Sequence, residues 1–399
     1  MKNLKFLIIA LVAMFGFISC DKDDCNHYDH SADLVGTWTC LQEGFAEALV
    51  ISADGSMVAT GLADGKYWDN VKGNITVKDG KATLAFEDNV KVEGHFDFVP
   101  GVAFSINTKE GERMVFNYCK EDLSDEILGM WVSTDNSSIE EHSVLVQTFN
   151  ENGKSVYTGF GEIDGEIVVK KESNYKVVGD LCFQEVNGKY IVFRVSYSRN
   201  GTSLGDIMSM INGGFTSTWL RIKQELNLTN KLYAYSSAYV SNAKGADEDF
   251  NILGHNFNMA NIANGNFDML FRSELFCVIF PNANTIKQIY RSNGQDVTID
   301  IPISVEGNKV TLDMSASIPV LRKVDMYMFQ DADDTQLHMY MPTQSFINYF
   351  ANLEVVTMMV EGKIDPTDAA AVAKVYADME ARVESINVSF VMKAIEPVE

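Results

Sequence analysis

Short runs that alternate apolar and polar residues fill most of this chain, and Asp-Gly or Asn-Gly pairs separate many of them. Residues 75–78 alternate up to Asp79-Gly80, and residues 81–86 then alternate again. Because both central residues of a type I′ turn need a positive φ, Asp-Gly between two alternating runs is a strong local signal of a β-hairpin. The pattern therefore predicts antiparallel meanders of short strands.

The meander begins twice with the same pattern of residues. Leu34-Val35-Gly36-Thr37-Trp38 and Ile127-Leu128-Gly129-Met130-Trp131 each consist of an apolar pair followed by Gly-x-Trp. A repeat at this spacing is too long for a solenoid unit and indicates tandem copies of one small β domain. We therefore expect a first domain over residues 34–121 and a second over residues 127–225.

A third unit, residues 230–399, lacks Gly-x-Trp but continues the meander. The pattern predicts a helix over residues 366–384, with Asp365 as N-cap, Pro366 at the first helical position and Asp368 favourable to the helix dipole. A short helix is also expected over residues 203–211, before the last strand of the second unit. This shared ending indicates that the third unit is an enlarged relative of the second.

The first 19 residues have the features of a secretory signal peptide. Lys2 and Lys5 form a basic start, and residues 6–17 form an apolar run too short to span a bilayer with margin. The run ends at Phe17-Ile18-Ser19-Cys20, which resembles the cleavage motif of bacterial lipoproteins, with Phe17 in place of the usual Leu. An ordinary secretory signal with an incidental cysteine is the alternative.

The residues after Cys20 carry a second resemblance, which concerns the localisation of the protein. Asp21-Lys22-Asp23-Asp24 resembles the signal by which lipoproteins of Bacteroidetes reach the outer face of the outer membrane. The two resemblances imply a lipid anchor at Cys20, a tether over residues 20–33 and exposure at the cell surface. Several acyl chains, at about 0.8 kcal/mol per buried methylene, hold a protein firmly to a membrane.

Gly-x-Trp at the start of a meander of this size resembles the lipocalin-like (calycin-like) barrels of uncharacterised Bacteroidetes lipoproteins. The resemblance implies an all-β fold of tandem small antiparallel β-barrels, the last with an added C-terminal helix. In lipocalins the tryptophan plugs the closed end of the barrel, and a basic side chain from the last strand often stacks on its ring. The residues that match these barrel-closing roles are Gly36, Trp38, Gly129, Trp131 and Arg221. For the first unit, both Arg113 and Lys120 remain open as the basic partner.

Charge excludes several classes of partner. The chain carries 32 basic and 55 acidic residues, for a net charge of −23, and 46% of its residues are hydrophobic. Such a surface repels phosphate backbones, which excludes nucleic-acid binding, and it repels anionic lipid. The only membrane contact expected is therefore the N-terminal lipid, and the acidic surface serves solubility.

Neither the cysteines nor the acidic loops predict a metal site. The six cysteines fit no zinc spacing. Cys40 and Cys119 lie on the first and last strands of the first unit, so a disulfide and two buried thiols are both open. The Cys/His-containing run 25–30 lies in the tether, which supplies no closed site. The acidic loops 247–249 and 331–334 lack a calcium-loop spacing and are expected to be solvated turns. No metal or other cofactor is predicted.

One stretch matches a catalytic motif. Gly201-Thr202-Ser203-Leu204-Gly205 is Gly-x-Ser-x-Gly, the pattern around the nucleophile of serine hydrolases. Asp247 or Asp249, with His255 or His338, follows in the Ser–Asp–His order. Hairpins surround the motif, whereas a hydrolase of this type requires alternating strands and helices. The sequence therefore predicts a protein that is not an enzyme, with no catalytic residues.

The third unit gathers methionines on one face of a predicted hairpin. Alternation along residues 324–329 and 336–341 places five apolar side chains together: Met326, Met328, Leu337, Met339 and Met341. Tyr327, His338 and Tyr340 share the opposite face. Because methionine adapts to irregular apolar shapes, the five residues are candidates to line a ligand cavity in a barrel. A plain core packed beneath the helix at 366–384 is the alternative, which we favour.

Three functions remain open at this point. The favoured one is a lipid-anchored, surface-exposed protein that binds a small apolar or glycan-derived ligand in a β-barrel. The alternative is an interaction module that docks on another envelope protein or on a host protein. An esterase that acts through Ser203 is the remotest of the three.

Overall fold

The computed structural model describes residues 30–395, apart from residues 88, 134–143, 164–165, 200–205, 253–254, 265, 274–275, 293 and 366. Cys20, the tether through residue 29 and the Gly-x-Ser-x-Gly motif with Ser203 lie outside the described residues. No helix in the described part of the chain is both long and apolar enough to cross a membrane. The chain divides into two compact units, residues 1–120 and 121–399.

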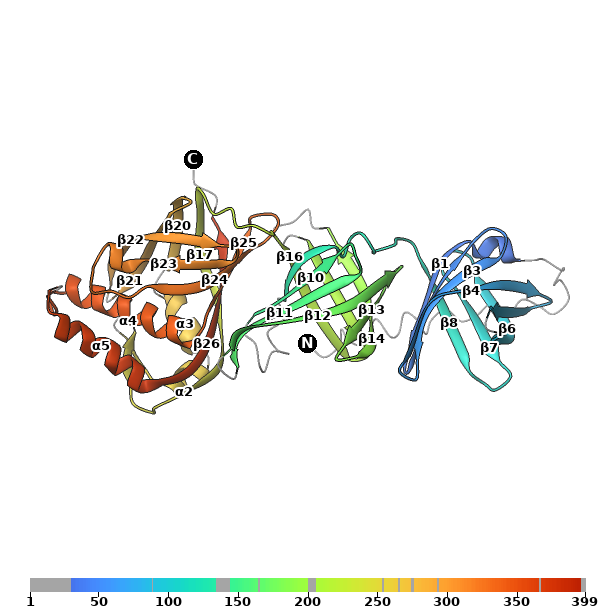
Figure 1. Cartoon of the computed structure of the whole chain (residues 1–399), viewed down its shortest axis with the longest axis horizontal. Helices are drawn as coiled ribbons and strands as arrows, with labels where there is room; N and C mark the ends of the chain where they lie inside the picture. The colour runs from blue at the N-terminus through green and yellow to red at the C-terminus, as the bar shows by residue number, and fades with distance from the viewer. Residues whose placement is uncertain are drawn as a thin grey trace. The chain divides into compact units, whose positions relative to one another are not determined.

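The first unit contains a closed barrel of eight antiparallel strands, each paired with the next along the chain (Figure 1). The strands are β1 (Gly36–Gln42), β2 (Phe45–Ile51), β3 (Ser56–Ala63), β4 (Lys66–Lys78), β5 (Lys81–Phe86), β6 (Lys91–Val99), β7 (Ala103–Thr108) and β8 (Arg113–Cys119). A short 3₁₀ turn, η1 (His30–Leu34), precedes β1, and β1 pairs with β8 to close the barrel. The interior is an apolar core built around Trp38.

The register of β1 with β8 decides the state of the two cysteines in this barrel. Cys119 stands opposite Thr37, three residues before Cys40. At about 3.3 Å per residue, the cysteines lie about 10 Å apart along the strands. A disulfide requires a Cα–Cα separation of about 4.4–6.8 Å. The bond considered between them is therefore absent, and Cys40 is a buried thiol.

The second barrel repeats the same eight-stranded order. Its strands are β9 (Gly129–Ser133), β10 (Val144–Asn150), β11 (Lys154–Ile163), β12 (Glu166–Val178), β13 (Leu181–Val186), β14 (Lys189–Ser198), β15 (Ile207–Asn212) and β16 (Phe215–Ile222). The helix expected over residues 203–211 is wrong, because residues 207–212 form strand β15. That strand pairs with β14 on one side and β16 on the other, and it buries Met208 and Met210 with period two.

The third barrel has the same strand order but carries helices between its strands. Its strands are β17 (Lys231–Gly245), β20 (Cys277–Asn282), β21 (Thr285–Ser292), β22 (Gln295–Glu306), β23 (Lys309–Leu312), β24 (Val324–Gln330), β25 (Gln336–Met341) and β26 (Val383–Ala394). The small hairpin β18 (Phe250–Ile252) and β19 (His255–Phe257) follows β17. All-β tandem barrels are therefore the architecture of the chain, as the pattern of short alternating runs predicts.

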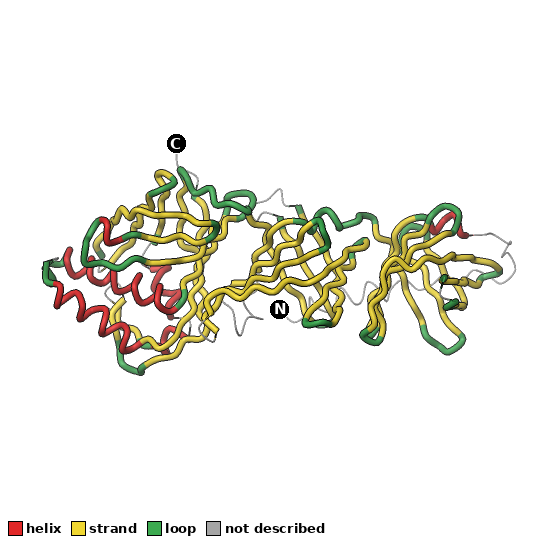
Figure 2. Tube along the Cα trace, viewed as in Figure 1, coloured by secondary structure: helices red, strands yellow, loops and turns green. Residues whose placement is uncertain are grey.

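Figure 2 shows that, apart from the short turn η1, the helices of the described chain belong to the third barrel. Helices α2 (Met259–Ala263) and α3 (Asn266–Ser273) lie between β17 and β20, while α4 (Thr343–Val360) and α5 (Ala369–Arg382) lie between β25 and β26; a 3₁₀ turn, η3 (Met314–Ala316), follows β23. Helix α5 lies within the range expected for a helix, but its N-cap is Asp368 rather than Asp365. Helix α4 is the larger of the two and was not predicted from the sequence.

The second and third barrels pack against each other through an apolar cluster. Its buried members are Val132, Val144, Val146, Phe160, Leu220 and Ile222 from the second barrel, and Phe329 and Tyr340 from the third. Phe160 is central to it, with its ring centroid 4.8 Å from that of Phe329 and 5.1 Å from that of Tyr327. This contact joins two barrels into one compact unit.

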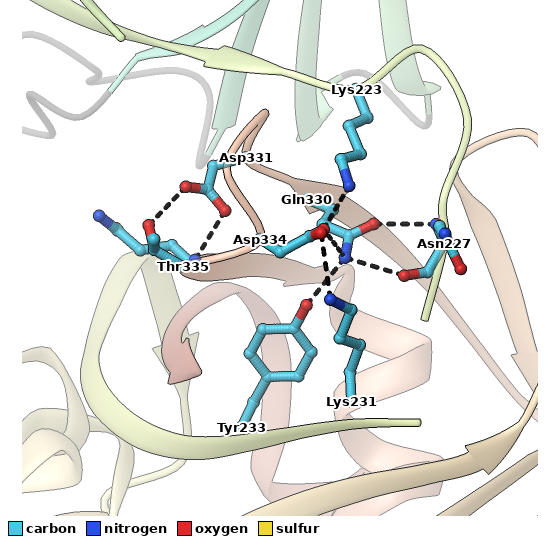
Figure 3. A network of polar contacts seen from close by, with 9 residues as sticks. Lys223, Asn227, Lys231, Tyr233, Gln330, Asp331, Asp334 and Thr335 are labelled. Carbon is cyan, nitrogen blue, oxygen red and sulfur yellow. Dashed lines mark hydrogen bonds and ion pairs between the residues drawn. The ribbon is translucent and has the colours of Figure 1, made fainter. Parts of the chain in front are cut away.

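Polar contacts beside this cluster connect the end of the second barrel to the β24–β25 turn (Figure 3). The backbone N–H of Lys223 donates to Gln330 at 2.9 Å, and that of Ala332 donates to Arg221 at 3.0 Å. Asp334 forms ion pairs with Lys223 and Lys231. Burial alone would raise the pKa of Asp334, but these two lysines hold it below its usual value.

The acidic turn 331–334 is therefore not the solvated loop expected from the sequence. Asp331 is fully buried, and its carboxylate accepts hydrogen bonds from the backbone of Gln336 at 2.7 Å and from the Thr335 hydroxyl at 2.5 Å. Burial raises the pKa of Asp331. The turn is thus fixed by its own strand residues and by Lys223 at the end of the second barrel.

Candidate functional site

Both Gly-x-Trp tryptophans are held in the same way. Trp38 and Trp131 are buried, and each indole N–H donates a 2.7 Å hydrogen bond to a backbone carbonyl four residues earlier, that of Leu34 or of Ile127. The bond fixes the orientation of the ring and satisfies a buried indole nitrogen. The barrel-closing role of the two residues stays a prediction.

The residue that stacks on each tryptophan comes from the last strand, at the same register in both barrels. Arg221 stands opposite Trp131, and its guanidinium carbon lies 4.4 Å from the centroid of the ring. In the first barrel the equivalent residue is Tyr118, whose ring meets Trp38 edge-on with centroids 5.0 Å apart. The position expected to hold Arg113 or Lys120 is therefore filled by an aromatic side chain.

The glycines of the two motifs make room for these stacking residues. Gly36 has φ +131° and Gly129 has φ +113°, a region that favours glycine. A Cβ on Gly36 would lie 2.7 Å from the ring of Tyr118, and one on Gly129 would lie 3.1 Å from the Arg221 guanidinium. The motif requires glycine for both conformation and space.

The open half of the second barrel contains a cavity of about 920 Å³, which we call the calyx. Residues from strands throughout the barrel line it: Ser133, Leu145, Gln147, Lys154, Tyr157, Lys171, Glu172, Ser173, Asn174, Gln184, Glu185, Val186, Asn187, Gly188, Phe193, Met210, Phe215, Ser217 and Trp219. This volume falls within the range of about 300–1,000 Å³ that is typical of small-molecule sites.

Uncharged polar side chains, with hydrogen-bonded neighbours, line the calyx beside apolar ones such as Leu145, Met210 and Trp219. The amide of Gln184 donates to the Ser155 hydroxyl at 3.2 Å, and the hydroxyls of Ser155 and Ser173 lie 2.9 Å apart. On the other side the indole N–H of Trp219 donates to Ser217 at 2.9 Å. Buried polar side chains are costly unless they are hydrogen-bonded, so their concentration in one barrel points to a role other than stability.

Gln147 is the exception within this wall. Its side chain is only 4% exposed, and it lies between Trp131 and Tyr157 in the register of β9, β10 and β11. The amide nitrogen Nε2 has no hydrogen-bond partner in the structure. A buried N–H donor is thus available beside the cavity.

The first barrel has apolar residues at the interior positions that are polar in the second. Trp38 stands opposite Leu49, whereas Trp131 stands opposite Gln147, so these two positions are equivalent. Following the pairing registers around both barrels makes Ser155, Gln184 and Ser217 equivalent to Met57, Leu84 and Met114. Four polar positions of the second barrel are therefore apolar core positions of the first.

The interior of the first barrel has its own polar side chain, at a different level. Glu47 occupies the position equivalent to Leu145 and is buried, and burial raises the pKa of its carboxyl to about 8. The carboxyl is therefore protonated at neutral pH. The two barrels have exchanged polar and apolar residues at equivalent interior positions.

Exposed charged side chains also line the calyx. Lys154 and Glu172 form an ion pair at 3.5 Å with both side chains well exposed, and Asn174 donates to Glu185 at 2.6 Å. Lys171 is exposed as well. Phe215, 47% exposed, and Val186, 40% exposed, add exposed apolar side chains to the same lining.

The methionine face of the third barrel lies elsewhere, in a packed core. Met326, Met328, Leu337, Met339 and Met341 are all buried, together with the apolar residues of helix α4, in the largest apolar cluster of the chain. This is the arrangement that the core interpretation describes. The ligand-lining role of these residues stays a prediction, and the cavity described above belongs to the second barrel.

The opposite face of that hairpin meets the second barrel. Phe329 stands opposite His338, and Tyr340 on the same strand as His338 joins the cluster around Phe160. His338 is buried, and burial lowers its pKa to about 4. The histidine considered as a triad member is therefore part of the contact between two barrels.

The polar wall of the calyx was not identified from the sequence, although a signal is present. Gln147, Gln184 and Ser217 alternate in phase with the buried residues Phe149, Cys182 and Trp219 on their own strands. Polar residues on the inward face of an otherwise apolar strand pattern mark an interior that is not a plain core. Comparison with the first barrel at equivalent positions makes the signal visible.

Comparisons with known proteins find matches among solved structures. No family model matches the chain, and no curated protein matches it. Among solved structures, a double mutant of transferrin binding protein B from Haemophilus parasuis Hp5 aligns with 13% identity and a TM-score of 0.23 over 88% of this chain and 66% of that chain. Isotype 1 of the same protein from serogroup B Neisseria meningitidis aligns over the same shares with 8% identity and a TM-score of 0.22. The chain thus spans about two thirds of the length of these structures, and at these scores the likeness assigns no family.

Proposed function

We propose that the protein is a lipid-anchored receptor or carrier, without enzymatic activity, that binds a small molecule in the calyx of its second barrel. The observation that carries this proposal is the exchange of residues between equivalent barrels. The first barrel fills the positions of Gln147, Gln184 and Ser217 with Leu49, Leu84 and Met114, whereas the second keeps polar side chains around a cavity of about 920 Å³.

Stability does not explain these polar residues. An apolar core at the same positions is available to the scaffold, because the first barrel has one. A buried polar group that lacks its partner costs about 1–3 kcal/mol, and Gln147 leaves its amide nitrogen unpaired. Natural proteins keep such costs mainly at functional sites.

The localisation expected from the sequence supports a receptor or carrier at the cell surface. The motif that ends at Cys20 and the acidic segment after it imply an anchor in the outer membrane, with the barrels outside the bilayer. The opening of the calyx, with Phe215 and Val186 exposed at its edge, is suited to ligand entry from solvent. Exposed apolar side chains beside a cavity are typical of binding sites.

The test is native mass spectrometry of the protein purified from its own bacterium. We expect one small molecule per chain, and we expect it to be lost from a triple variant, Gln147→Leu, Gln184→Leu and Ser217→Met, which copies the first barrel. Because those residues pack in the first barrel, the variant is expected to fold, which circular dichroism checks.

A folded triple variant that retains the small molecule would contradict the proposal. A partner protein at constant ratio, in place of any small molecule, would favour the interaction module instead. Met328→Phe with Met341→Phe is the matched control in the third barrel, and it is expected to leave the amount of bound molecule unchanged.

A further inference from the structure

We infer that the ligand of the calyx is an uncharged, oxygen-rich molecule of the saccharide class; this inference rests on the proposed function. The uncharged polar groups that line the calyx include the primary amides of Gln147 and Gln184 and the hydroxyls of serines on β9, β12 and β16. Amides and hydroxyls both donate and accept hydrogen bonds, as a ligand with many hydroxyl groups requires.

A charged ligand does not match this wall. The charged side chains that line the calyx are two lysines and two glutamates, and Lys154 is paired with Glu172. Because these charges balance, a charged ligand would lose hydration without gaining a net counter-charge. The net charge of −23 also opposes the approach of anions.

An alkyl ligand does not match it either. Gln147 offers a buried N–H with no partner, which an alkyl chain would leave unpaired. Sites built to hydrogen-bond a ligand discriminate strongly against analogues without the matching group, because their own buried polar atoms then remain unsatisfied. A ligand oxygen beside Gln147 would supply the missing acceptor.

The aromatic residues of the calyx complete the match. Trp219, Phe193 and Phe215 lie among the polar residues of the cavity, and Tyr157 stands opposite Gln147. A sugar ring has polar hydroxyls at its edge and a face of C–H groups, which packs on aromatic rings. Polar groups interleaved with aromatic side chains therefore fit a saccharide better than either a fatty acid or an ion.

The experiment is isothermal titration calorimetry of the purified protein with maltotriose, cellotriose, xylotriose, mannotriose and N,N′,N″-triacetylchitotriose. Dodecanoate and 1-dodecanol are titrated as alkyl probes. We expect one or more of the trisaccharides to bind with one site per chain. Gln147→Leu is expected to weaken that binding at least tenfold, whereas Thr148→Val, on the outward face of the same strand, is expected to leave it unchanged.

The outcomes separate this inference from the proposed function. If an alkyl probe binds with one site per chain, Gln147→Leu keeps or tightens that binding, and no trisaccharide binds, the saccharide class is wrong while a small-molecule calyx stands. Trisaccharide binding that Gln147→Leu leaves unchanged overturns the assigned site. If neither class binds and the native protein carries no small molecule, both the inference and the proposed function fail.

Discussion

Arg221 is held in the second barrel by several groups at once. Its guanidinium donates to the carbonyls of Leu128 at 2.7 Å and of Glu126 at 2.5 Å, stacks on Trp131 and lies 3.4 Å from the carboxylate of Asp206. These contacts join strand β16 to β9 and to the segment just before β9. The side chain therefore connects the first and last strands of the barrel.

Replacing Arg221 by Leu is expected to lower the free energy of unfolding of the second unit by about 3 kcal/mol, because charge-assisted hydrogen bonds to buried carbonyls are lost. Urea denaturation followed by circular dichroism measures the change. Arg199→Leu is the matched control, since Arg199 pairs with the Glu126 side chain but is 72% exposed. A pair this exposed is expected to contribute far less than the contacts of Arg221. Equal losses in the two variants would refute the role of Arg221.

At the scale of single residues, the sequence identifies the residues that recur in both barrels more readily than those that differ between them. Trp38 and Trp131 are visible because a Gly-x-Trp pair recurs in front of the same meander. Gln147 is not, because a polar residue in an amphipathic strand is usually assigned to the solvent face. Its phase with the buried Phe149 on the same strand is the signal that it points inward, and the pairing with Trp131 shows that it does.

Among the elements, strands were easier to predict than helices. Turns such as Asp79-Gly80 and Asn187-Gly188 have the positive φ values that their sequences predict, so the hairpins follow from local chemistry. Helix α4 was missed because twelve of its eighteen residues are buried, which removes the polar face that marks an amphipathic helix. The sequence predicts a short helix over residues 203–211, but pairing with β14 and β16 makes Ile207–Asn212 a strand.

The start of helix α5 gives a test at this scale. The carboxylate of Asp368 accepts from the backbone N–H groups of Ala370 and Ala371 at 3.1 and 3.0 Å, whereas Asp365 binds only the turn at Thr367. Asp368→Ala is expected to destabilise the second unit by about 1 kcal/mol, the usual cost of losing an N-cap. Asp365→Ala is expected to cost clearly less than Asp368→Ala, because it is not the N-cap. Thermal unfolding of both variants decides between the two residues, and the reverse order would support the N-cap that the sequence alone suggests.

At the scale of the molecule, the second and third barrels together form one compact unit. Phe160 reaches the rings of Tyr327 and Phe329, and the acidic turn 331–334 docks on the strand that carries Arg221. A repeat in sequence predicts the barrels but not this contact, because outward faces of strands are normally assigned to solvent. The joint buries His338 without a hydrogen-bond partner for its Nε2 atom.

The buried histidine makes the stability of this unit depend on pH. Its folded-state pKa of about 4 lies below the usual value of 6.5, so the unfolded chain takes up the proton first as pH falls. Stability is therefore full above about pH 6.5 and falls between pH 6.5 and 4, by up to about 1.4 kcal/mol per pH unit. Urea denaturation at pH 7 and pH 5 is expected to show a larger loss for the wild type than for His338→Gln. Equal losses would mean that His338 keeps an ordinary pKa.

The central claim is that the calyx of the second barrel holds the ligand, and a crystal structure of the protein isolated from its own bacterium tests it most directly. The account predicts electron density for a bound molecule beside Trp219, with an oxygen atom within hydrogen-bond distance of Gln147 Nε2. A ligand bound only in the first or the third barrel, or a calyx that holds water alone while the native protein carries a small molecule, would contradict it.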